Sequence, residues 1–209
     1  MEKERLYKNA KGVIKLSKTA LYVDINKPYA VSWFIKGFEE ILLRTIDRDC
    51  SHIVILCIGT DRSTGDCLGP LVGHKLRYIQ GEYIRVYGTL NEPVHAKNLK
   101  ATIKKIEERY ENPFIISIDA CLGKPESIGC ISIGEGPIKP GAGVNKKLPE
   151  IGHMHVMGIV NISWFMEYMI LQNTRLSLVM KMADIISAGI YYNLSKLVSR
   201  KLKPAATKK

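Results

Sequence analysis

Uninterrupted apolar runs alternate with amphipathic segments along most of this chain. Residues 52–59 (HIVILCIG) form a continuous aliphatic run of the kind that predicts a strand buried on both faces of a parallel sheet. Residues 114–120 (FIISIDA), apolar apart from Ser117 and Asp119, predict a second buried strand. In residues 29–47, by contrast, apolar side chains recur at helical spacing. The pattern therefore predicts strands and helices in alternation.

The same rhythm continues to about residue 120 and then changes. Before residue 120 we expect helices at about 67–80 and 96–110, with a strand at about 84–90 between them. After residue 120 we expect a short strand or hairpin (SIGCISIGEG) and then an irregular loop at 136–152. The chain should end with a last strand (HMHVMGIVN) and helices at about 163–172 and 176–202. Strand-helix alternation implies right-handed crossovers between parallel strands. The predicted fold is α/β, a three-layer arrangement with a mostly parallel sheet and helices on both faces.

The length and charge distribution suggest one globular body with basic ends. The 209 residues, 46% of them hydrophobic, can fill a single core, and no repeat or linker divides them. We therefore predict a basic leader at 1–20, one α/β domain at 21–202 and a basic tail at 203–209. The net charge is +11, but residues 1–20 hold +4 and residues 194–209 hold +6. The body is nearly neutral, so we expect no specific nucleic-acid partner.

The chain also lacks the usual signals for export. It has no run of about 18 uncharged apolar residues and no apolar segment behind its first charges, so we expect no membrane span and a cytoplasmic location. The cysteines are odd in number and contain no C-x-x-C pair, which predicts reduced thiols: Cys50, Cys57, Cys67, Cys121 and Cys130.

Two acids are the main candidates for chemistry. In parallel sheets, ligands bind beyond the carboxyl ends of the strands. Asp119 is the penultimate residue of FIISIDA, and Asp66 closes the loop that follows HIVILCIG, so both are predicted at one edge. Each also has a structural interpretation: Asp66 could be the N-cap of the next helix, and Asp119 could anchor the next loop.

Other candidate sites carry weaker signals. The loop GTDRSTGD has neither G-x-G-x-x-G nor the lysine of a phosphate-binding loop, so we predict no nucleotide there. His153 and His155 are two apart and could share a strand face as metal ligands, although an ordinary half-exposed strand explains them as well. His52, His74 and His95 carry less signal still. Cys121 has no assigned base and is better interpreted as a structural thiol. We expect no cofactor, with a divalent metal at the Asp pair as the alternative.

Four motifs resemble those of a known family: IGTDRSTGDCLGPLVG, FIISIDACLG, IKPGAGVNKKLPEIG and GIVNISWFMEYMILQNTRLSLVMKMAD. Over residues 30–195 the chain resembles the YyaC-type sporulation proteins, relatives of the spore germination protease. It is more distantly similar to hydrogenase maturation proteases, which implies a phosphorylase/hydrolase-like fold. In the germination protease pattern, one Asp stands just before x-L-G-P and a second ends a strand as I-D-A. These positions match Asp66 and Asp119.

The resemblance implies an aspartate-dependent peptidase of sporulating bacteria, acting on a protein or peptide in the sporulating cell or forespore. One carboxyl of the pair would keep its proton while the other activates a water. Backbone amides around Gly141 and Gly143 would stabilise the oxyanion. In maturation proteases an acid, an Asp and a His hold nickel, and no His of this chain matches the third position.

A non-catalytic binding or assembly factor on the same fold is the competing hypothesis, because a fold does not fix a function. Self-association into a homo-oligomer is also left open by the sequence.

Overall fold

The computed structural model describes residues 5–9, 12–16, 20–47, 49–140, 148–164 and 166–201. The strands within these ranges are β1 (Arg5–Asn9), β2 (Gly12–Leu16), β3 (Ala20–Asp24), β4 (Ile53–Cys57), β5 (Ile84–Tyr87), β6 (Phe114–Gly123), β7 (Cys130–Glu135) and β8 (Met154–Ile162). The α-helices are α1 (Ala30–Thr45), α2 (Leu68–Leu76), α3 (Leu99–Arg109), α4 (Glu167–Gln172) and α5 (Leu176–Lys201), with short 3₁₀ turns η1 (Arg77–Ile79) and η2 (Pro125–Ser127).

The strands form one sheet in the order β1-β2-β3-β7-β8-β6-β4-β5. The pairs β8–β6, β6–β4 and β4–β5 are parallel. Within this half, Ile55 of β4 is in register with Ile116 of β6 and Val86 of β5. The two apolar runs therefore lie side by side and parallel, as the sequence predicts, and their carboxyl ends share an edge.

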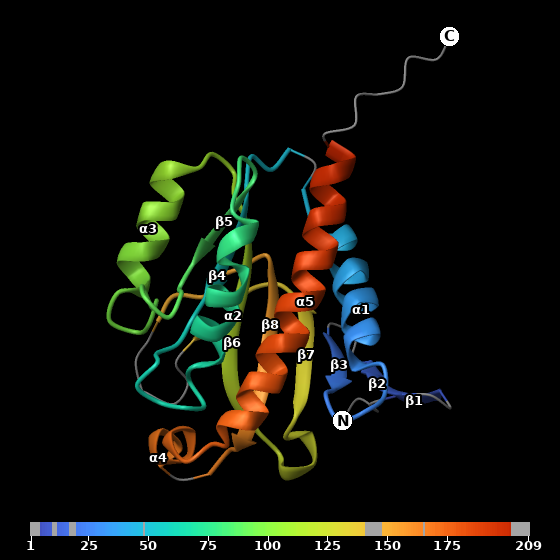
Figure 1. Ribbon diagram of the computed structural model, residues 1–209. Coiled ribbons are helices and arrows are strands. Elements are labelled where there is room, and N and C mark those ends of the chain that lie inside the picture. The colour runs from blue at the N-terminus through green and yellow to red at the C-terminus, as the bar shows by residue number, and fades with distance from the viewer. Residues whose placement is uncertain are drawn as a thin grey trace.

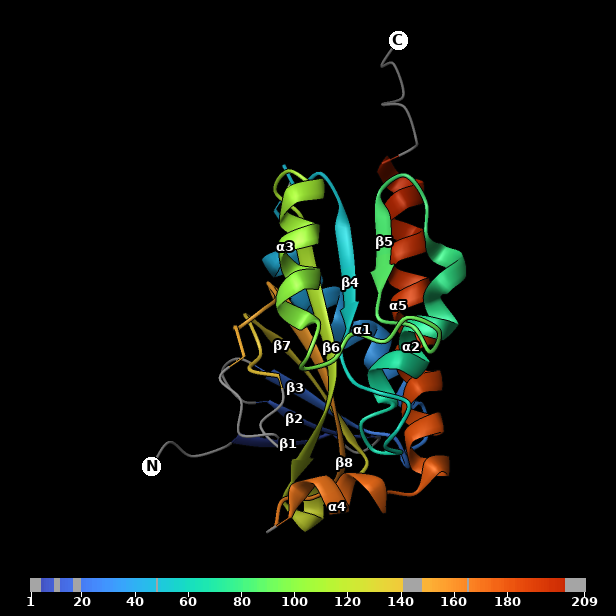
Figure 2. The ribbon, with the colours of Figure 1, turned by 90° about the vertical axis from the view of Figure 1, so that its left-hand side faces the viewer.

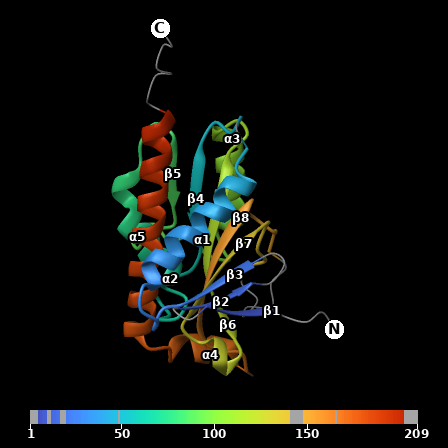
Figure 3. The same ribbon diagram turned by 90° about the vertical axis from the view of Figure 1, so that its right-hand side faces the viewer.

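Helices cover both faces of the sheet, which confirms the α/β class. Helices α1, α2 and α5 lie against one face, and α3 lies on the other (Figures 1, 2 and 3). The same division appears in the packing: one apolar cluster joins the sheet to α1, α2 and α5, and a second joins it to α3. No helix in the described ranges is long and apolar enough to cross a bilayer.

Strand β4 lies between these two clusters. All five of its residues are buried. Ile55 and Cys57 belong to the cluster beneath α1, α2 and α5, whereas Val54 and Leu56 belong to the cluster beneath α3. Successive side chains of a strand point to opposite faces, so a strand with a core on each side must be apolar throughout.

The other half of the sheet departs from the expected parallel arrangement. Strands β7, β3, β2 and β1 are joined by antiparallel pairings, so the sheet is mixed. Strand β3 was not foreseen, because only Leu21 and Val23 of its five residues are buried. Two buried positions in alternation are too few to predict a strand from the sequence. Strands β1 and β2 come from the stretch that the sequence assigns to a basic leader.

Candidate active site

The loop between β4 and α2 carries Asp66 back to the end of β4. The Gly59 amide donates to the Val94 carbonyl at 2.8 Å, and the Thr60 amide donates to the Asp66 carbonyl at 3.2 Å. Gly59 has φ +141°, a conformation that side chains rarely adopt, and a Cβ there would lie 1.9 Å from the Asp66 carbonyl oxygen. The sharp turn at Gly59 therefore fixes where Asp66 lies.

Asp66 is not the N-cap of α2. That helix begins at Leu68, its N-cap is Cys67, and no side-chain hydrogen bond caps it. Burial raises the pKa of the Asp66 carboxyl, while a hydrogen bond from the Thr60 amide and the charge of His95 lower it. The capping interpretation fails because Asp66 precedes the helix by one residue too many and turns toward the loop and His95.

Asp119 lies in β6, directly after the last residue of that strand paired with β4. Its side chain is only 4% exposed, and one carboxyl oxygen accepts a hydrogen bond from the Ala120 amide at 2.8 Å. Burial and, next, the negative charge of Asp66 raise its pKa well above the usual range of an aspartate. The hydrogen bond is to the adjacent amide, so it does not tie down the loop that follows β6.

The two carboxyls are therefore electrostatically coupled and unequal. Asp66 keeps some stabilisation of its charged form from Thr60 and His95, whereas Asp119 is buried and faces the charge of Asp66. Such a pair titrates as a unit, and the first proton lost belongs mainly to Asp66. A carboxylate beside a neutral carboxylic acid is the arrangement that general acid-base chemistry needs.

His95 belongs to this site, although the sequence ranked it below other histidines. A bridge between Val94 and Ile58 brings the segment after β5 beside the end of β4. The Asn98 side chain accepts from the His95 amide at 2.8 Å, and the Lys97 amide donates to the imidazole Nδ1 at 3.3 Å. An accepting Nδ1 leaves the neutral ring's proton on Nε2. The signal for His95 was its place in the segment that follows the parallel strand β5, at the same edge as both acids.

Two thiols border the carboxyls but are not activated. Burial, and then the charge of Asp119, raises the pKa of Cys121 to about 12. Burial also raises the pKa of Cys67, with the charges of Asp61 and Asp66 adding to it. A nucleophilic cysteine needs a lowered pKa, so both are structural thiols in this environment.

The histidines proposed as weak metal candidates have other partners. His153 Nδ1 accepts from the Ile115 amide at 3.0 Å, and its ring stacks on Phe114. His155 Nδ1 lies 3.0 Å from the Gly136 carbonyl. In the part of the chain that the structure describes, no group of three His, Cys, Asp or Glu residues could hold a metal ion. The residues present at the Asp pair thus do not fit a three-ligand site.

The remaining site prediction cannot be placed. Gly141 and Gly143, the expected oxyanion donors, lie outside the described residues. The described parts of their loop are joined by a bridge between Ile138 and Ile151, and both of these residues pack in the α3-side cluster. The loop thus begins and ends on the sheet face to which α3 belongs.

Helix α4 packs across the Asp66 loop. The Gly65 amide donates to the Leu171 carbonyl at 2.8 Å, and the Asn161 side chain of β8 donates to the Ile170 carbonyl at 3.3 Å. Figure 2 shows α4 across one end of the sheet. Several large apolar side chains on and beside it are more than half exposed: Trp164, Met166, Tyr168, Met169 and Leu176. The loop that bears Asp66 therefore lies next to an apolar rim.

Replacing Asp119 by Asn should stabilise the protein at neutral pH. The folded chain holds the Asp119 proton more tightly than the unfolded chain. The protonated Asp119 therefore contributes its full share of stability below about pH 3.9, the pKa of an aspartate in the unfolded chain. This contribution is lost as the pH rises through the pKa of Asp119 in the folded chain. Asn carries no charge and does not lose this contribution. The melting temperature of the variant relative to the wild type should therefore increase from pH 5 to pH 8, by roughly 2–4 °C for each kcal/mol of difference in the free energy of unfolding.

Thermal unfolding of the variant and the wild type at several pH values measures this gain. Asp61→Asn is the matched control, because Asp61 is an exposed aspartate of the same chain region and should give no such trend. A gain that is absent, or that shrinks as pH rises, contradicts a pKa of Asp119 that is raised in the folded chain.

Comparisons with known proteins identify relatives but give no activity. The profile of a family described as "Protein of unknown function (DUF1256)" matches residues 27–189. The "Uncharacterized protein YyaC" of Bacillus subtilis (strain 168) is 59% identical over 156 residues, which cover 74% of this chain and 76% of that protein. A solved structure, the NiFe hydrogenase maturation protease HycI from Thermococcus kodakarensis KOD1, is 14% identical with a TM-score of 0.49, covering 75% of this chain and 97% of that one. A similarity at that level supports no argument about this chain.

Proposed function

This chain belongs to the family described as protein of unknown function (DUF1256), and we propose that it is an aspartate-dependent peptidase. Asp66 and Asp119 would activate a water to cleave a protein or peptide substrate. The observation that carries the proposal is the buried Asp119, whose pKa is raised well above its usual range by burial and by the charge of Asp66. Perturbed carboxyls that converge at the carboxyl edge of a parallel sheet are typical of catalytic sites.

The unequal pair assigns a role to each acid. The Asp66 carboxylate accepts a proton from water as the water oxygen bonds to the peptide carbonyl carbon. Asp119 donates its proton to the amide nitrogen as the C–N bond breaks. The products are a carboxylic acid and an amine, and proton exchange with solvent restores the pair. General acid-base help of this kind contributes about 10²- to 10⁴-fold. Amides near Gly141 and Gly143 are the proposed oxyanion donors.

The surroundings of the pair favour a polymeric substrate. The apolar rim on α4 adjoins the Asp66 loop, and it includes Trp164 and Met166 at 69% and 72% exposure. Exposed aromatic and methionine side chains of this kind suit apolar residues of an extended polypeptide. The resemblance to germination proteases supports a protein substrate in the cytoplasm of a sporulating cell.

His95 is proposed as a positioning residue that tunes Asp66. The protonated form of His95 lowers the Asp66 pKa, so His95→Gln should raise that pKa. The acidic limb of the kcat/KM profile should then move to higher pH, because Asp66 must be ionised to act as base. His155→Gln is the control, since His155 contacts the Gly136 carbonyl instead. An unchanged acidic limb in His95→Gln would remove His95 from the mechanism.

The proposed reaction needs no metal. Peptide cleavage should therefore persist after exhaustive chelation and should not rise on addition of divalent ions. Loss of activity on chelation, with recovery on adding one metal, would replace the water-activating Asp pair by the metal alternative.

The direct test of the proposal is cleavage of an unfolded protein by the purified chain, compared with Asp66→Asn and Asp119→Asn. Cleavage that requires both acids supports the peptidase. Tight binding of a protein without cleavage would instead favour the binding-factor hypothesis.

A further inference from the structure

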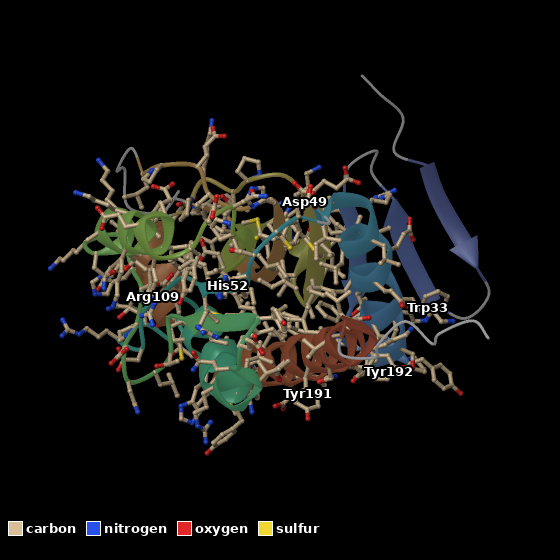
Figure 4. All side chains as sticks on the ribbon, turned by 90° about the horizontal axis from the view of Figure 1, so that it is seen from above. Trp33, Asp49, His52, Arg109, Tyr191 and Tyr192 are labelled. Carbon is tan, nitrogen blue, oxygen red and sulfur yellow. The ribbon has the colours of Figure 1, made fainter. Side chains whose placement is uncertain are left out.

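A cationic cluster lies at the opposite end of the sheet from the Asp pair. His52 precedes β4, Arg85 lies in β5, and Arg109 is the last residue of α3. All three surround Tyr110: the His52 ring centroid is 4.5 Å from the Tyr110 centroid, and the Arg85 and Arg109 guanidinium carbons are 5.9 and 5.6 Å from it. Figure 4, seen from above, labels His52 and Arg109 at this end.

The two guanidinium groups have no acid partner. Among the described residues, neither Arg85 nor Arg109 has a carboxylate within 4.0 Å, although lysines nearby do, as in the Lys104–Glu108 pair. Arg85 Nη1 donates a hydrogen bond to the Ile84 carbonyl at 3.0 Å, and the other N–H groups of this guanidinium remain to bind a ligand. Both guanidinium groups lie near the Tyr110 ring with no carboxylate of the described residues within 4.0 Å, so a bound anion would offset their positive charge.

The environment of His52 and Tyr87 reports the same excess of positive charge. Burial, followed by the charges of Arg85 and Arg109, lowers the pKa of His52, and no acidic group contributes to the shift. Tyr87 lies beside them, with its hydroxyl 3.3 Å from that of Tyr110. The charged and polar groups that act on His52 or touch it are thus the Arg85 and Arg109 guanidinium groups, the Tyr110 ring and the Ser51 hydroxyl.

We propose that Arg85, Arg109 and His52 form a binding site for a phosphate group. Planar guanidinium forks bind phosphate oxygens with two parallel hydrogen bonds, and Tyr110, only 5% exposed, provides a fixed ring against which they lie. A phosphate carries nearly two negative charges at neutral pH and matches two arginines, whereas a carboxylate neutralises one. The site is independent of the Asp pair, because it lies at the amino ends of β4 and β6.

Titration with inorganic phosphate, followed by NMR and calorimetry on the whole chain, tests this site. Arg85→Gln and Arg109→Gln should each weaken phosphate binding about tenfold or more, because each removes charge-assisted hydrogen bonds. Arg77→Gln is the matched control. Arg77 also stacks on a tyrosine, with its guanidinium carbon 4.0 Å from the Tyr78 ring centroid, but among the described residues no second arginine lies over that ring. Equal loss in the control, or no loss in either cluster variant, overturns the proposal.

The wild type offers a second measurement that does not depend on a variant. Phosphate should neutralise the arginines and raise the His52 pKa, so the His52 ring resonances should titrate at higher pH when phosphate is present. Acetate at the same concentration should cause a smaller shift. An unchanged His52 titration, or an equal effect of acetate, contradicts a phosphate site. Peptide cleavage should be the same in the cluster variants as in the wild type, so this site can fail while the proposed function stands.

Discussion

Replacing Asp66 or Asp119 by Asn is expected to lower kcat for peptide cleavage by about 10²- to 10⁴-fold. Asn keeps the size of the side chain, so the chain should remain folded. At position 66 it cannot accept the proton of the attacking water, and at position 119 it has no acidic proton to give. Steady-state kinetics with one cleavable peptide, measured from acidic to neutral pH, would determine the loss.

The double variant and a nearby control make the experiment specific. Groups that act as a unit are non-additive, so Asp66→Asn with Asp119→Asn should be little worse than either alone. Asp61→Asn, an exposed change in the same loop, should retain activity. A loss of stability without a loss of activity would instead assign Asp66 and Asp119 to structural roles.

Gly59→Ala is expected to destabilise the chain by roughly 2–4 kcal/mol and to cost most of its activity. The added methyl would lie 1.9 Å from the Asp66 carbonyl oxygen and 3.1 Å from the Pro70 ring. Its φ of +141° is also strained for any side chain. Asp66 would have to move, and a misplacement of about 1 Å in a catalytic group can cost 10²-fold.

Gly81→Ala separates this effect from the general cost of replacing a glycine. Nothing lies within 4 Å of a Cβ at Gly81, so that variant should match the wild type in melting temperature and in kcat. If Gly59→Ala also keeps wild-type activity, the turn at Gly59 does not fix the position of Asp66 in the way we describe.

The centre of the parallel half was predictable because β4 and the first six residues of β6 are buried on both faces. Residues 53–57 are apolar without interruption, residues 114–118 are apolar except for the buried Ser117, and the two runs pair in parallel. Once two such strands are neighbours, an acid that follows each must reach the same edge. The sequence therefore predicts Asp66 and Asp119 at one edge of the sheet, and in the structure the charge of Asp66 raises the pKa of Asp119.

The antiparallel half and His95 were not predictable in the same way. Strand β3 has only two buried apolar residues, Leu21 and Val23, so its tertiary pairing with β7 decides its conformation. His95 lies in a loop, and loop positions depend on contacts such as the Val94–Ile58 bridge. The alternative interpretation of Asp66 as a helix N-cap fails because α2 begins one residue later than expected, which places the capping position at Cys67.

Incubation of the purified chain with a library of unfolded polypeptides, followed by mass spectrometry of new termini, tests the central claim most directly. The Asp66→Asn, Asp119→Asn double variant, prepared in parallel, provides the background. We expect new termini with the wild type, enriched in apolar residues beside the cleaved bond, and none above background with the double variant. The same termini in both samples, or none in either, would contradict a peptidase that works through this pair of aspartates.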